Sequence, residues 1–207
     1  MDKIHILYFL EDRAQEGFVQ ALVERIALGE GLDREDLVHD IRSAGGGSKV
    51  ITDFEKFIRD YALAVEDVDF LVVAIDGNCK GHTERIKDLE KHIGSDHALK
   101  NKVVYAVPDP HIERWYIMDQ RAFKKGVGLA KGPEEQPKYK CKKDFYKQVV
   151  REALLNGGVS SLLGGVEYAE RIVANIDNID VLGKQDDGFS CFVNGLKKMF
   201  GKRIAGV

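Results

Sequence analysis

Acidic side chains follow three apolar runs of the sequence, at the point where each run ends. They are Glu11 and Asp12, Asp76 with Asn78 two residues later, and Asp109 followed by His111 and Glu113. If the runs are parallel strands, acids at their carboxyl ends meet at one sheet edge and repel one another unless a cation lies between them. Such oxygen ligands suit Mg²⁺ or Mn²⁺. The alternative for any single acid is an ordinary helix N-cap.

The pattern of apolar residues predicts strands and helices that alternate along the first half of the chain. The predicted strands are 5–10, 37–41, 68–75 and 102–107, and the predicted helices are 16–27, 54–61 and 83–93. The run VDFLVVAI at 68–75 is apolar on both faces, as in a parallel strand covered by helices on both sides. This order predicts an α/β protein with a doubly wound parallel sheet.

After Pro108 the pattern becomes mainly helical. Predicted helices cover 111–118, 142–155, 159–176 and 188–200, and the Gly-, Pro- and Lys-rich stretch 124–140 is predicted as a loop. We therefore expect an α/β core at 1–123 and a helical extension at 140–207 that packs on this core.

The composition excludes several classes of protein. The chain has 207 residues, of which 44% are hydrophobic and 31% charged, so it is not generally disordered. No apolar run approaches the roughly 18 residues of a membrane span, and the N-terminus has no signal-peptide cleavage site, so we expect no membrane contact. The cysteines Cys79, Cys141 and Cys191 are odd in number and far apart. They predict neither a disulfide framework nor a zinc site, and the expected compartment is the cytoplasm.

Charge is distributed unevenly along the chain. Residues 1–120 carry a net charge of −9 and residues 121–207 a net charge of +6. An acidic half beside a basic half fits a metal site next to a polyanion-binding surface, although chance partition of surface charge is the alternative. The strongest candidate for contacts with nucleic acid is a basic run with interleaved aromatic residues. It includes Lys140, Lys142, Lys143 and Lys147.

Several motifs resemble the topoisomerase–primase (TOPRIM) family, and more closely a family of uncharacterised bacterial proteins with a TOPRIM-like core. FLEDRAQEGF at 9–18 resembles the opening V-E-G-x-[ST]-E-x-x-F, and Asp76-Gly77-Asn78 resembles the D-x-D motif. A P-x-x-E-x-W-x-x-x-D-like segment is matched by Pro110, Glu113, Trp115 and Asp119, and GGGSK at 45–49 resembles a Gly-rich turn that carries a lysine. The resemblance covers about residues 4–120.

The resemblance implies a Mg²⁺- or Mn²⁺-dependent, nuclease-like enzyme that cleaves phosphodiester bonds, of a kind used in defence or repair. Asp76 and Asn78 would be metal ligands, Glu11 a ligand or the general acid–base, and Glu113 a second catalytic group that completes the metal shell. Lys49 of the Gly-rich turn would contact a backbone phosphate. Asn78 replaces the second aspartate of D-x-D and contributes no charge.

Two other functions stay open. A TOPRIM-like domain without catalysis could act as a binding or regulatory protein, which Asn78 favours. A receiver-like signalling domain also places acids after its first and central strands, but it needs a lysine directly after a late strand, and 103–107 is not followed by one. The helices after residue 140 could pair with a second copy of the chain or with a partner protein.

Overall fold

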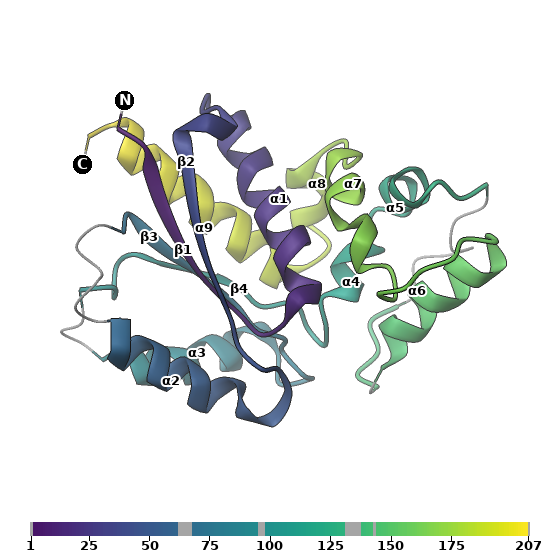
Figure 1. Cartoon of the computed structure of the whole chain (residues 1–207), viewed down its shortest axis with the longest axis horizontal. Coiled ribbons are helices and arrows are strands. Elements are labelled where there is room, and N and C mark those ends of the chain that lie inside the picture. The colour runs from purple at the N-terminus through teal and green to yellow at the C-terminus, as the bar shows by residue number, and fades with distance from the viewer. Residues whose placement is uncertain (1, 62–67, 95–97, 131–137, 143, 207) are drawn as a thin grey trace.

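The computed structural model describes residues 2–61, 68–94, 98–130, 138–142 and 144–206. Along the chain the elements are β1 (Ile4–Leu10), α1 (Arg13–Gly29), the 3-10 helix η1 (Arg34–Asp36), β2 (Leu37–Ser43), the 3-10 helix η2 (Gly47–Lys49), α2 (Val50–Tyr61), β3 (Phe70–Ala74), α3 (His82–Ile93), β4 (Val103–Ala106), α4 (Glu113–Tyr116), α5 (Gln120–Val127), α6 (Phe145–Asn156), the 3-10 helix η4 (Val166–Tyr168), α7 (Ala169–Ala174), α8 (Ile179–Gly183) and α9 (Asp187–Ile204) (Figure 1). In these described ranges, no helix is long and apolar enough to cross a membrane.

The four strands form one parallel sheet in the order β2-β1-β3-β4. The chain leaves β1 for β2 on one side and later returns to β3 on the other side, so the order reverses between β1 and β3. Ligands of open α/β sheets bind beyond the carboxyl ends of the strands at such a reversal. Leu10 and Ala74, the last residues of β1 and β3, are partners in the register. The residues that follow these two strands therefore emerge next to each other.

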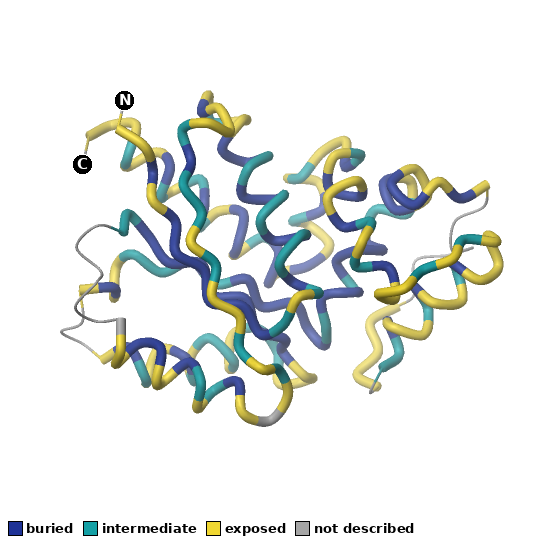
Figure 2. The backbone as a smooth tube through the Cα atoms, viewed as in Figure 1, coloured by how far each residue is buried: buried dark blue, intermediate teal, exposed yellow. Residues whose placement is uncertain are grey.

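Helices cover both faces of the sheet, as the apolar pattern of 68–75 predicts (Figure 1). Strand side chains alternate between two cores. Tyr8 and Val72 belong to the core that contains α1 and α9, whereas Phe9 and Val73 belong to the core that contains α2 and α3. Figure 2 shows the central strands buried along most of their length. The expected α/β class with a parallel sheet is thus confirmed.

The C-terminal helix α9 packs on one face of the sheet. It packs on β4 and α1, and its Phe200 meets Phe70 of β3 edge to face, with ring centroids 5.5 Å apart. Near its start, Trp115 of α4 packs between Phe189 and Phe192. The sheet and the end of the chain therefore share one hydrophobic core.

Two predictions for the C-terminal half need correction, and one helix was not predicted. Residues 124–127, predicted as loop, belong to α5, because Asp119 caps this helix by accepting from the Ala122 amide and because Phe123 is buried. The helix predicted over 159–176 is a short 3-10 turn followed by α7, since Gly164 and Gly165 take left-handed φ angles of 70° and 102° that a helix cannot contain. The short helix α8 had no counterpart among the predicted elements.

Candidate active site

A cavity of about 350 Å³ opens at the carboxyl ends of β1 and β3, where the strand order reverses. Its wall includes Glu11, Asp76, Asn78, Cys79, His111 and Lys147. These residues come from the ends of two strands, from the loop after β4 and from the distant helix α6. A larger hollow of about 540 Å³ lies beside α1 and α7, but none of its lining residues follows the carboxyl end of a strand. We therefore consider the smaller cavity the candidate site.

Glu11 and Asp76 are joined by a hydrogen bond at the edge of the sheet. Glu11 directly follows β1, and its Oε2 atom accepts from the Asp76 backbone N–H at 2.8 Å. Both side chains are buried, with 6% of their surface exposed. Neighbouring Asp12 instead caps α1 by accepting from the Ala14 amide. The helix-cap alternative is thus correct for Asp12, whereas Glu11 and Asp76 do not cap a helix.

Gln15 bridges the two acids, and sequence reasoning did not identify it. Its Oε1 atom accepts from the Glu11 backbone N–H at 2.9 Å, and its Nε2 atom donates to Asp76 Oδ1 at 3.0 Å. The side chain is completely buried. Its position in the first turn of α1, four residues after Glu11, is the signal that could have revealed it, because a polar residue there faces back toward the strand end.

The environment of Glu11 favours its protonated form. Burial, together with the negative charge of Asp76, raises the pKa of Glu11 from 4.5 to about 7. Near neutral pH the carboxyl group therefore occupies both protonation states. A carboxyl group with this property can accept a proton and later return it.

Asp76 also contacts His111, which lines the same cavity. Asp76 Oδ1 accepts from the Ile112 backbone N–H at 3.1 Å, and Oδ2 lies 3.1 Å from His111 Nδ1. This hydrogen bond to Asp76 is the main cause that raises the pKa of His111. Asp76 therefore favours the protonated form of His111.

Glu113 lies close to this group but does not line the cavity. It begins α4 and is buried, and burial raises the pKa of its carboxyl group. It interacts electrostatically with Lys147, Asp76 and His111. Its Oε2 atom is buried and has no hydrogen-bond partner among the described residues. The expected role of Glu113 in a metal shell stays a prediction.

The loop after β3 has an unusual backbone that other segments hold in place. Asn78 and Cys79 have positive φ angles of 50° and 67°, and Asp144 on the same cavity has 58°. They are the non-glycine residues with positive φ in the described ranges. Such conformations cost free energy and persist only where the surrounding structure holds them. They are frequent at functional sites.

Gly77 is needed for the close approach between this loop and Asp109. A Cβ atom at position 77 would lie 2.3 Å from Asp109 Oδ1. The same Oδ1 atom accepts from the Cys79 backbone N–H at 2.8 Å. Asp109 therefore anchors the loop that carries Asn78 and Cys79 into the cavity wall.

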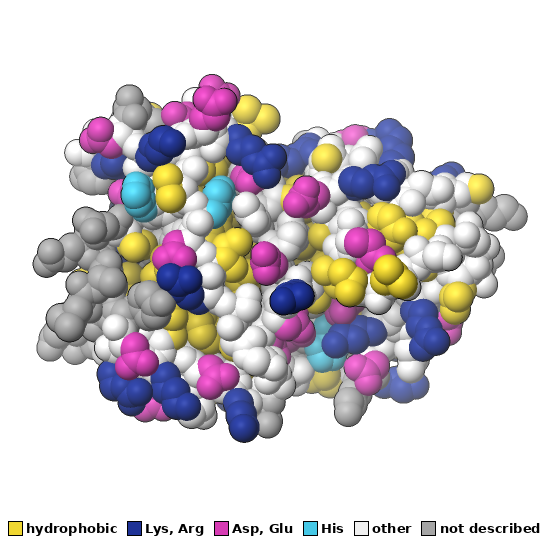
Figure 3. Space-filling view, in the orientation of Figure 1, with side chains coloured by type: hydrophobic (Ala, Val, Ile, Leu, Met, Phe, Trp, Pro, Cys, Tyr) yellow, Lys and Arg dark blue, Asp and Glu magenta, His cyan; other side chains and the backbone are white. Residues whose placement is uncertain are grey.

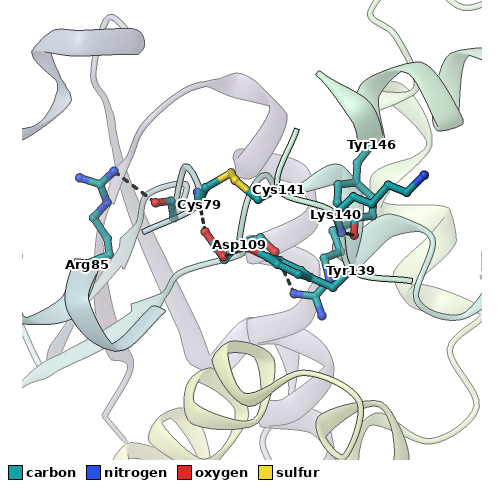
Figure 4. The surroundings of a disulfide bond; sticks show 9 residues. Cys79, Arg85, Asp109, Tyr139, Lys140, Cys141 and Tyr146 are labelled. Atoms are coloured by element: carbon teal, nitrogen blue, oxygen red, sulfur yellow. Dashed lines mark hydrogen bonds between the residues drawn. A yellow bond between two sulfur atoms is a disulfide. The ribbon is translucent and has the colours of Figure 1, made fainter. Parts of the chain in front are cut away.

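Cys79 and Cys141 form a disulfide, which the number and spacing of the cysteines did not predict. Although 62 residues separate them in the sequence, their Cα atoms are 5.4 Å apart (Figure 4). The error arose because spacing along the chain says nothing about segments that the fold brings together. Cys191, on α9, is free and exposed.

The predicted phosphate-binding lysines differ in their distance from the cavity. Lys147, in the first turn of α6, lines the cavity, and Lys140 and Lys142 are exposed on the segment that leads to α6. Lys49 is exposed at the end of η2, two residues after Gly47 of the cavity wall. Lys143 lies outside the described residues. Figure 3 shows acidic, basic and histidine side chains gathered between the lower edge of the sheet and α6.

Across the part of the chain that the structure describes, no three His, Cys, Asp or Glu side chains are grouped so that they could hold a metal ion by themselves. No protein-family model, no curated protein and no solved structure matches the chain significantly. The resemblance to TOPRIM proteins therefore stays a prediction, and the function is inferred from the cavity itself.

Proposed function

We propose that the cavity is the active site of a Mg²⁺- or Mn²⁺-dependent enzyme that hydrolyses phosphodiester bonds in nucleic acid. One observation carries the proposal: Glu11, with a pKa of about 7, lies next to Asp76 in a cavity that Lys147 also lines. A group that exchanges protons near neutral pH, beside cations that attract an anion, is what the cleavage of a phosphate ester requires.

The donor groups in the cavity fit a metal ion that arrives together with a phosphate. Glu11 and Asp76 provide two carboxylates, and Asn78 lies on the same wall. Mg²⁺ keeps several waters and is usually held by one or two carboxylates plus the phosphates of the substrate, so a complete protein cage is not needed. Glu113, which lies close to the cavity but does not line it, has a buried carboxylate oxygen with no hydrogen-bond partner among the described residues. When bound, the ion supplies positive charge at a non-bridging phosphate oxygen.

The side chains of the cavity would accept a proton and bind the phosphate group. Glu11 accepts the proton of the attacking water at its carboxylate, which is populated at neutral pH because the pKa of Glu11 is about 7. Asp76 holds His111 in a fixed orientation through the contact at 3.1 Å. Lys147 and His111, whose protonated form the contact with Asp76 favours, orient the phosphate group through hydrogen bonds.

Nucleic acid is the favoured substrate because the basic run leads directly into the cavity. Lys140 and Lys142 are exposed on the segment before α6, and Lys147 reaches the cavity wall from α6. Exposed Tyr139 lies on the same segment. Lysines along one path contact successive phosphates, and an aromatic ring beside them can stack on a base.

A second candidate is a nucleic-acid-binding protein without catalysis. Asp76 favours it, because Oδ1 already accepts from the Gln15 side chain and the Ile112 amide and Oδ2 contacts His111. A carboxylate engaged in this way must release a partner before it can bind a metal ion. Cleavage assays separate the two candidates.

The test is the cleavage of end-labelled oligonucleotides, with single-stranded and duplex DNA and RNA each incubated with millimolar Mg²⁺ or Mn²⁺. The informative variant is Glu11→Gln, which keeps the size and the acceptor oxygen of the side chain. Glu55→Gln, an exposed residue of α2, is the matched control. We expect metal-dependent cleavage by the parent chain and by the control.

Loss of the acid–base group should slow cleavage by a factor of about 10² or more in Glu11→Gln. Binding without cleavage of any substrate would favour the second candidate. Cleavage that Glu11→Gln leaves unchanged would remove the cavity from the reaction.

A further inference from the structure

The segment 138–142, here called the strap, is fastened to the loop after β3. Besides the disulfide between Cys141 and Cys79, the Tyr139 hydroxyl donates to Asp109 Oδ2 at 2.7 Å. The Arg114 guanidinium lies 5.1 Å from the centre of the Tyr139 ring. Figure 4 shows Tyr139 and Asp109 beside the disulfide. Asp109 thus links the strap to the loop after β3, because its Oδ1 atom accepts from the Cys79 amide.

The strap is also linked to the first turn of α6, which carries Lys147. The Lys140 backbone N–H donates to the Tyr146 hydroxyl at 3.1 Å, which links the strap to the first turn of α6. On the core side, α6 buries only Tyr146, Val150 and Leu154 among its described residues. The same first turn places Lys147 on the cavity wall. Fastening the strap therefore fixes a cation at the candidate site.

The disulfide is accessible to a reductant. Cys79 and Cys141 are both exposed residues, although Cys79 also contributes to the wall of the cavity. Exposed disulfides exchange with thiols more readily than buried ones, and they are the ones that proteins use for regulation. The disulfide is exposed, and Cys141 lies six residues before Lys147 of the cavity wall. The redox state of the disulfide can therefore affect the position of Lys147.

We propose that the Cys79–Cys141 disulfide is a redox-sensitive latch: when formed, it holds the strap and Lys147 at the cavity, and its reduction by a dithiol releases them and weakens the binding of nucleic acid. The part of this proposal that concerns binding rests on the function proposed above. The part that concerns the strap depends only on the contacts of Cys79, Tyr139 and Cys141.

The chemistry is an ordinary exchange that consumes one dithiol per latch. A thiolate of the dithiol attacks one cysteine sulfur, the bond between Cys79 and Cys141 breaks, and the other cysteine leaves as a thiolate. The second thiol of the reductant then displaces the first cysteine. The dithiol becomes a cyclic disulfide, and two electrons and two protons pass to the two cysteines.

The test measures the strap and nucleic-acid binding separately in the full chain before and after treatment with dithiothreitol. Thiol counting under native conditions should give one reactive thiol, that of Cys191, before reduction and three after it. Hydrogen exchange then reports the protection of the amides of 138–156. Fluorescence anisotropy reports the affinity for a labelled oligonucleotide.

We expect reduction to speed hydrogen exchange in α6 by a factor of about ten or more, because a helix that loses an anchor opens locally more often. Exchange in β1 should stay the same, and affinity for the oligonucleotide should fall several-fold over the same titration. The double variant Cys79→Ser/Cys141→Ser should resemble the reduced chain and ignore dithiothreitol. Cys191→Ser is the matched control and should respond like the parent.

The possible outcomes separate the latch from the proposed function. Faster exchange in α6 without oligonucleotide binding in either redox state would support the latch and count against the nucleic-acid function. Three reactive thiols before reduction, or α6 exchange that reduction leaves unchanged in the parent, would overturn the latch. The parent measured in both redox states supplies this answer even if the double variant fails to fold.

Discussion

The backbone N–H of Asp76 donates to the Glu11 carboxylate at 2.8 Å, so the first acid after β1 and the first acid after β3 form one hydrogen-bonded pair. The parallel register of the two strands makes this pairing possible, because Leu10 and Ala74 are partners. Gln15 then contacts both members of the pair. This arrangement, and the cavity in front of it, determine how the protein should respond to pH, substitution and salt.

Glu11 should make the stability of the protein depend on pH. Its pKa is about 7 in the folded chain, against an ordinary value of 4.5. Between these values the folded chain keeps the proton that the unfolded chain loses, so the free energy of unfolding falls as pH rises through this window. Glutamine does not titrate, so Glu11→Gln does not lose stability in this way. Near pH 8 its free energy of unfolding should be higher than that of the parent by about 1–3 kcal/mol.

The measurement is urea denaturation of the parent, Glu11→Gln and Glu55→Gln at low and high pH. Near pH 4, below the unfolded-state pKa of 4.5, the parent and Glu11→Gln should have nearly equal stability, because Glu11 is then mostly protonated in both the folded and the unfolded chain. Glu55→Gln should follow the parent at both pH values. A Glu11→Gln variant that is less stable than the parent near pH 8 would contradict the raised pKa.

Gln15→Met should destabilise the fold although it preserves the volume of the side chain. The substitution removes one of the two acceptors of the Glu11 amide, which also donates to the Ala74 carbonyl, and one of the two donors to Asp76 Oδ1, which also accepts from the Ile112 amide. Each lost hydrogen bond in this completely buried place costs about 0.5–1.5 kcal/mol. Gln20→Met, on the partly exposed side of α1, should change the free energy of unfolding by less than about 0.5 kcal/mol. Equal denaturation midpoints for the two variants would refute the bridging role of Gln15.

Gly77→Ala should disturb the loop that carries Asn78 and Cys79. The new methyl group would overlap the Asp109 side chain, which the Cys79 amide and the Tyr139 hydroxyl hold in place. Such crowding costs about 1–3 kcal/mol. Gly201→Ala in α9 has no atom within 4 Å of the added Cβ and should instead stabilise the chain by up to about 1 kcal/mol. Chemical denaturation gives the free energy of unfolding of both variants. An unchanged value for Gly77→Ala would contradict the prediction and show that the loop can move away from Asp109.

The basic run should determine how salt affects nucleic-acid binding. Replacement of Lys140, Lys142 and Lys147 by glutamine should make the slope of log affinity against log salt shallower by about 0.7–0.9 for each phosphate that the variant no longer neutralises. The control replaces exposed lysines outside this run, Lys56, Lys100 and Lys202. Binding measured by fluorescence anisotropy across a salt series gives both slopes. An unchanged slope in the first variant and a shallower slope in the control would locate the binding surface elsewhere.

The first half of the fold was predictable because its apolar runs are short, strongly hydrophobic and followed by polar residues. The strand predicted at 68–75 contains β3, and the strand predicted at 5–10 lies within β1. The C-terminal half was less predictable, because its helices are short and amphipathic and glycines divide them. A helix such as α5 forms through its capping residue and through its packing on α7, which a local pattern does not reveal.

The juxtaposition of Glu11 and Asp76 was predictable for a general reason: parallel strands bring their carboxyl ends to one edge. The other parts of the site depend on contacts between distant segments. Lys147 reaches the cavity from α6, and Cys79 pairs with Cys141 across 62 residues. Neither relationship leaves a trace in local spacing. Position after a strand also does not prove that an acid belongs to the site, because Asp12 follows β1 and caps α1 instead.

Anomalous diffraction from crystals grown with Mn²⁺ and a short oligonucleotide tests the proposed active site directly. We expect a manganese peak in the cavity, within about 2.0–2.3 Å of a Glu11 or Asp76 carboxylate oxygen, with a phosphate of the oligonucleotide as a further ligand and Lys147 beside it. An oligonucleotide bound elsewhere on the chain, with a cavity that holds no manganese, would contradict the proposed active site.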